Sequence, residues 1–71
     1  MKTHIGERIA ALRSERGFSK AKLARDSIIH PSDISKFENG HARPYPGQVE
    51  RLARALGVQP ADLLDPEGGA Q

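Results

Sequence analysis

The stretch that decides the fold is KAKLARDSIIHPSDISKF, residues 20–37. Its apolar spacing predicts two short amphipathic helices joined by a tight turn, and the second helix opens at residues 29–31. Ala24 provides a small side chain in the first helix, and Ile34 and Phe37 form an apolar pair in the second. A helix-turn-helix requires this layout, in which a positioning helix closely crosses an exposed second helix.

Apolar residues recur at helical spacing in the flanking sequence as well, and no strict alternation indicates a strand. The predicted helices are about Ile5–Arg16, a second helix from Ser19 to Asp26 or Ser27, a third from His30 to Glu38, about Pro46–Leu56, and a short one from Pro60 through Leu64. Ser19 is a good N-cap for the second helix. At the third helix we expect His30 at the cap and Pro31 at the first helical position, where a missing N–H costs nothing.

Length and composition predict one small all-α domain. We expect it to span residues 1–65 and to be followed by a disordered tail, residues 66–71. Cysteine is absent and the three histidines are dispersed, so no metal site or cofactor is expected. No apolar run is long enough for a membrane span and no signal peptide is evident, which favours a soluble cytoplasmic protein.

Charge is spread unevenly along the chain. Residues 1–43 contain nine Lys and Arg against five Asp and Glu, whereas residues 44–71 contain two against four. A basic front and a mildly acidic back fit a protein that presents one face to a polyanion. Ordinary solvated surface charge explains the same excess.

The chain resembles the Cro/repressor-type helix-turn-helix family of bacterial and phage transcriptional regulators. The resemblance covers about residues 5–64 and rests on IGERIAALRSERGFSKAKLA, DISKFENG and LARALGVQPADLL, in the family's order and spacing. It implies a compact five-helix repressor-like fold with double-stranded DNA as the partner. The positions that match the family's core are Ile5, Ile9, Leu12, Leu23, Ala24, Ile29, Ile34, Phe37, Leu52 and Leu56.

By the same resemblance, base readout falls to the outward face of the third helix, at Pro31, Ser32, Asp33 and Lys36. Lys36 could donate to guanine or to a phosphate, and Pro31 offers apolar contact to a thymine methyl. Asp33 could accept from cytosine or could simply complement the helix dipole. Ser32 can either donate or accept, so it specifies little.

Four further positions match the family's DNA-backbone contacts: Lys20, Asn39, Gly40 and Arg43. Arg13 and Glu38 match a pair that joins the first helix to the third in related repressors. An arginine beside an apolar stripe needs a planar acceptor, which agrees with that role. The alternative is that both side chains are solvated.

The turn between the second and third helices departs from the family pattern. Ile28 stands where the family has a left-handed glycine, and Ser27 stands where it has an apolar residue. A β-branched residue is costly in the left-handed region. We therefore expect a different turn shape or an earlier helix end, with Ile28 packing in place of Ser27.

The predicted function is a sequence-specific DNA-binding transcriptional regulator, a dimeric repressor that reads a (pseudo)palindromic operator. The candidate dimer interface is Gly57, Val58, Pro60 and Leu64. The alternatives are an antitoxin, a restriction-modification controller, or an adaptor that keeps the fold without reading DNA. No catalytic set, phosphate loop or small-molecule ligand site emerges, so an enzyme is disfavoured.

Overall fold

The computed structural model describes residues 4–64, which form five α-helices and contain no strand. The helices are α1 (Ile5–Glu15), α2 (Lys20–Ser27), α3 (Pro31–Glu38), α4 (Pro46–Leu56) and α5 (Pro60–Leu64). The predicted all-α class and the order of the elements are confirmed. The predicted tail, residues 66–71, lies outside the described residues.

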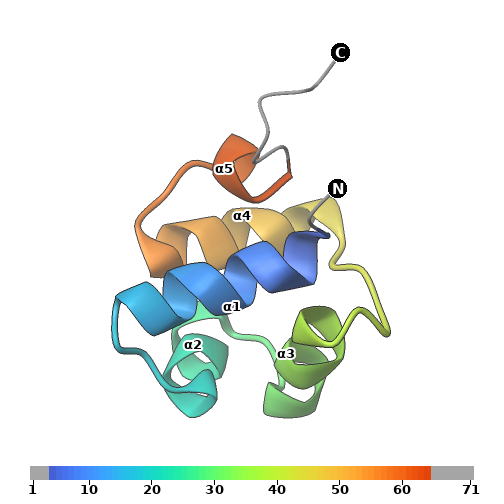
Figure 1. Ribbon diagram of the computed structural model, residues 1–71, viewed down its shortest axis with the longest axis horizontal. Helices are drawn as coiled ribbons and strands as arrows, with labels where there is room; N and C mark the ends of the chain where they lie inside the picture. Colours follow the sequence, from blue (N-terminus) through green and yellow to red (C-terminus); the bar gives the residue numbers. More distant parts are fainter. Residues whose placement is uncertain (1–3, 65–71) are drawn as a thin grey trace.

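The helices form a layered arrangement around one core. Figure 1 shows α1 and α4 side by side, with α2 and α3 at one end of the molecule and α5 at the other. Every helix contributes to the core, whose buried apolar residues are Ile5, Ile9, Leu12, Leu23, Ala24, Ile29, Ile34, Phe37, Val49, Leu52, Ala53, Leu56 and Leu63. All ten predicted core positions are among them, because helical periodicity sorts apolar side chains onto one face.

Local chemistry determines where the helices begin. The Ser19 hydroxyl accepts a hydrogen bond from the Lys22 N–H at 3.0 Å, which caps α2. His4 and His30 cap α1 and α3 in the same way through a ring nitrogen. Three of the five helix starts therefore satisfy otherwise unpaired N–H groups with a side chain of the preceding residue.

A close crossing of α1 and α3 depends on Gly6, a residue that sequence patterning did not single out. A Cβ atom built on Gly6 would lie 1.6 Å from the Phe37 carbonyl oxygen and 2.9 Å from the His4 ring. The glycine hydrogen therefore permits a backbone approach that no other side chain allows. The available signal was a glycine in the first turn of a predicted helix, where it costs stability.

We expect Gly6→Ala to lower the free energy of unfolding by at least about 2 kcal/mol, because the added methyl group meets backbone rather than a movable side chain. Thermal unfolding followed by circular dichroism measures the effect. Gly47→Ala, in the first turn of α4, is the matched control, since its Cβ would approach only an Arg51 guanidinium nitrogen at 4.0 Å. Equal melting temperatures for the two variants would contradict the close-packing argument.

The turn between α2 and α3 corrects the sequence-based expectation. Ile28 adopts the left-handed conformation (φ 59°, ψ 47°), and α2 continues to Ser27 before it. Ile28 is 79% exposed, so it does not pack in place of Ser27. Ser27 is fully buried, and its hydroxyl donates to the Leu23 carbonyl at 2.6 Å. The serine satisfies its own polar group within α2, while Ile29 supplies the apolar contact to the core.

Because Ile28 contributes little burial, its main effect on stability is backbone strain. We expect Ile28→Gly to be more stable than Ile28→Ala by about 1 kcal/mol, since both remove the exposed side chain but only glycine relieves the Cβ clash of the left-handed conformation. Urea unfolding of the two variants measures the difference. A more stable alanine variant would show that the turn is not strained.

Candidate nucleic-acid interface

Helix α3 presents one continuous outward face. Pro31, Ser32 and Lys36 are exposed on it, Asp33 is half-buried, and Ile34 and Phe37 are buried on the opposite side. The predicted readout residues therefore share one helix surface. Pro31 occupies the first helical position and Asp33 the first turn, where its charge complements the helix dipole.

The predicted backbone-contact residues lie at the margins of this face. Lys20, the first residue of α2, is exposed, and its Nζ lies 3.5 Å from the Ser35 hydroxyl of α3. Asn39 is the C-cap of α3, and Gly40 and Arg43 follow it as exposed residues. Exposed cations, Lys20 and Arg43, thus flank the α2–α3 unit, whereas the backbone N–H groups of Asn39 and Gly40 already donate to carbonyls of α3.

Two further basic residues of α2 differ in availability. Lys22 donates to the Asp26 carboxylate at 2.8 Å and lies over the Phe18 ring, 4.9 Å from its centroid. The hydrogen bond from Lys22 holds the pKa of Asp26 below its ordinary value. Arg25 has 75% of its side chain exposed, and its Nε lies 4.0 Å from the Asp26 carboxylate, farther than the Lys22 Nζ. Arg25 is therefore the freer of the two cations on this helix.

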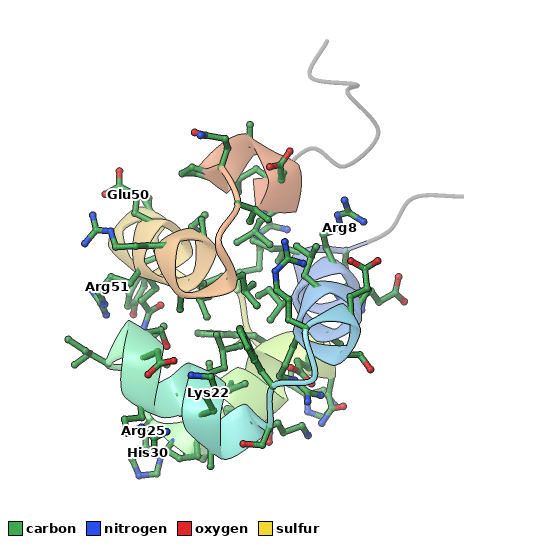
Figure 2. All side chains as sticks on the ribbon, turned by 90° about the vertical axis from the view of Figure 1, so that its left-hand side faces the viewer. Arg8, Lys22, Arg25, His30, Glu50 and Arg51 are labelled. Atoms are coloured by element: carbon green, nitrogen blue, oxygen red, sulfur yellow. The ribbon has the colours of Figure 1, made fainter. Side chains whose placement is uncertain are left out.

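The carboxyl end of α2 is held by Arg51 of α4. The Arg51 Nε donates to the Ser27 carbonyl oxygen at 2.8 Å, which satisfies an acceptor left open at the end of the helix. Figure 2 shows Arg51 on the α4 side that faces α2. Residue patterns in the sequence do not reveal this contact, because its acceptor is a backbone carbonyl.

Arg13 of α1 and Glu38 of α3 form a two-pronged ion pair. The Arg13 Nε and Nη2 donate to the two Glu38 carboxylate oxygens at 2.7 and 3.1 Å, and Nη1 donates to the Phe18 carbonyl at 2.9 Å. Their side chains are only 19% and 6% exposed. The hydrogen bond to Glu38 raises the pKa of Arg13. This planar fit joins the carboxyl end of α3 to α1.

Removing one partner of this pair leaves the other charge half-buried without compensation. We expect Glu38→Ala to lower the free energy of unfolding by about 3 kcal/mol, the cost typical of breaking such a pair. Urea unfolding measures it, with Glu50→Ala as the control because Glu50 is an exposed carboxylate on α4. If the two variants unfold at the same urea concentration, the pair does not stabilise the fold.

The candidate dimer residues lie around α5, and they differ in exposure. Gly57 is exposed at the end of α4, Val58 packs partly against the core, and Pro60 is half-buried. Leu64 is 56% exposed, so α5 carries a large apolar side chain at the surface. The structure thus separates Leu64 from Val58, whose apolar surface is already used within the fold.

Other kinds of site find no support in residues 4–64. That range contains no group of His, Cys, Asp and Glu side chains that could hold a metal ion. It also contains no helix long and apolar enough to cross a membrane. An apolar surface depression lies beside the start of α3, bordered by Ile28, Arg25 and His30.

Comparison with known proteins identifies the family. The model of the helix-turn-helix domain family matches residues 4–65. The chain is 38% identical over 62 residues to the control protein C.BamHI of Bacillus amyloliquefaciens, a match that covers 86% of this chain and 76% of that protein. The protein therefore belongs to the helix-turn-helix family, among the Cro/repressor-type transcriptional regulators that its sequence resembles.

Two other similarities define the extent of the match. The chain is 47% identical over 58 residues to the HTH-type transcriptional regulator RamB of Mycobacterium tuberculosis, covering 80% of this chain but 12% of RamB. The crystal structure of the P22 c2 repressor protein with a synthetic operator superposes with a TM-score of 0.85 at 28% identity. That alignment covers 90% of this chain and 97% of the repressor chain.

Proposed function

We propose that the protein is a sequence-specific repressor that binds double-stranded DNA as a homodimer, with α3 in the major groove of a (pseudo)palindromic operator. The observation that carries this proposal is the amphipathic placement of α3: its inner face is buried while its start and outer face remain exposed. The likeness to the P22 c2 repressor in complex with a synthetic operator supports it.

Within this arrangement the start of α3 meets the base edges, as in other helix-turn-helix proteins. Lys36 donates to guanine or to a phosphate, and Pro31 contributes apolar contact. Asp33 is half-buried, which favours its role at the helix dipole over a base contact. Lys20, Asn39, Gly40 and Arg43 contact the sugar-phosphate backbone and determine the register on DNA.

A dimer follows from the size of the contact surface. One exposed face of an eight-residue helix reads only a few base pairs, so affinity and specificity require a second copy. Two-fold pairing places two copies of α3 about 34 Å apart on one side of the DNA. The exposed Leu64 supports an interface at the α4–α5 end.

Two variants separate base readout from phosphate contact. We expect Lys36→Ala to relax base preference at one position by about 1–3 kcal/mol. Arg43→Ala should weaken binding to all sequences about equally. It should also reduce the slope of the logarithm of the binding constant against the logarithm of the salt concentration by about one. Binding measured against selected and random duplexes over a range of salt concentrations distinguishes the two effects.

Arg54→Ala is the matched control, because it removes an exposed arginine from α4 rather than from the α2–α3 surface. Its salt dependence should equal that of the unmodified protein. A salt dependence unchanged by Arg43→Ala would remove Arg43 from the interface. If no duplex is enriched from random DNA, even at low salt, the DNA-binding proposal fails.

A second candidate is control of a restriction-modification system by the same domain. The similarity to the control protein C.BamHI favours it, because that match extends over 76% of the relative. The genes that flank the selected operator discriminate between the two roles. Under either role the protein binds DNA rather than catalysing a reaction, and its place is the cytoplasm.

A further inference from the structure

His30 holds the start of α3 through a ring nitrogen, Nδ1, that lies within hydrogen-bond distance of two groups of Ser32. The backbone N–H of Ser32 donates to the His30 Nδ1 at 3.1 Å. The Ser32 hydroxyl lies 2.8 Å from the same nitrogen. Both contacts occur at the end of the helix that meets base edges in helix-turn-helix proteins.

These two contacts determine where the protons lie. A backbone N–H can only donate, so Nδ1 must be an acceptor and the neutral ring must bear its proton on Nε2. Since Nδ1 then has no hydrogen, the Ser32 hydroxyl proton must point toward it. Otherwise the lone pairs of two acceptors would face each other across 2.8 Å.

These proton positions determine which hydrogen-bond donors and acceptors the start of α3 presents to a ligand. Ser32 uses its only hydroxyl proton inside the protein, so its oxygen is left as an acceptor. His30 is exposed, with Nε2–H as a donor that has no hydrogen-bond partner within residues 4–64. Figure 2 shows the His30 ring projecting from the end of the molecule formed by α2 and α3.

His4 offers an internal comparison, because it caps α1 through the same ring atom. Its Nδ1 accepts from the Glu7 N–H at 3.2 Å, but its Nε2 lies 3.5 Å from the Glu7 carboxylate. The outward nitrogen of His4 therefore has an acidic neighbour within the protein. At His30 the equivalent nitrogen faces solvent on the proposed DNA-binding surface.

We propose that His30 is a specificity-determining residue, and that His30 and Ser32 together read the major groove as one fixed donor and one fixed acceptor. Ser32 then selects an amino group, adenine N6 or cytosine N4, over the carbonyl groups of guanine and thymine. The Nε2–H of His30 selects a neighbouring acceptor such as a purine N7. This inference rests on the proposed function and names which base edges the site accepts.

The decisive variant is His30→Ser, which keeps a capping oxygen but has no ring to hold the Ser32 proton. Ser19 already caps α2 by accepting from the Lys22 N–H, so serine suits a helix start in this fold. The variant should therefore keep its melting temperature. Ser32→Ala is the companion variant, because it removes the acceptor and leaves the ring in place.

The test is selection from random duplex DNA with the unmodified protein and both variants. We expect the unmodified protein to prefer adenine or cytosine at one position of each half-site. In both variants the preference for that base at the same position should fall about threefold to tenfold, which corresponds to the loss of one hydrogen bond. Replacing the preferred base with purine or 2-pyrimidinone, which lack the amino group, should weaken only the unmodified protein.

The outcomes separate this inference from the function on which it rests. If the unmodified protein enriches a site but His30→Ser keeps the same base preference, the assigned proton positions of His30 and Ser32 are wrong, while the DNA-binding proposal stands. The same holds if the preferred base at the shared position displays a carbonyl group. If the unmodified protein enriches no sequence at low salt, both the proposed function and this inference fail.

Discussion

The position of α3 depends on the two-pronged ion pair between Arg13 and Glu38. It joins the carboxyl end of α3 to α1 at 2.7 and 3.1 Å, and its third hydrogen bond reaches the loop before α2. Close packing at Gly6 brings the same two helices together. An exposed helix can read DNA only if its orientation is fixed. Any contact that α3 makes with DNA therefore depends on these contacts with α1.

The turn between α2 and α3 shows how the fold tolerates an unfavourable residue. Ile28 takes the left-handed conformation that glycine would occupy at lower cost. The contacts on both sides impose that conformation. Arg51 donates to the carboxyl end of α2, and the Ser27 hydroxyl donates to a carbonyl within α2. Ile29, the next residue after Ile28, is buried in the core. Several neighbouring contacts thus outweigh about 1–2 kcal/mol of local strain.

Much of the fold could be predicted because its determinants are local in sequence. Apolar spacing defined the buried faces, and Ser19, His30 and Pro31 marked helix starts that the structure contains. The prediction for Ile28 was wrong because it weighed the residue's own preference and omitted the contacts on both sides of it. Gly6 and Arg51 were missed because each acts on a backbone atom of a distant element.

The sequence by itself determined the helices, the core and the family, since periodicity, capping and motif spacing are properties of the chain alone. It also placed the proposed readout residues on one helix. Only the tertiary structure decided which candidate interface side chains are exposed: Val58 is used by the core, Asp33 is half-buried, and Leu64 is exposed. Availability depends on distances between groups, and those distances arise only when the chain is folded.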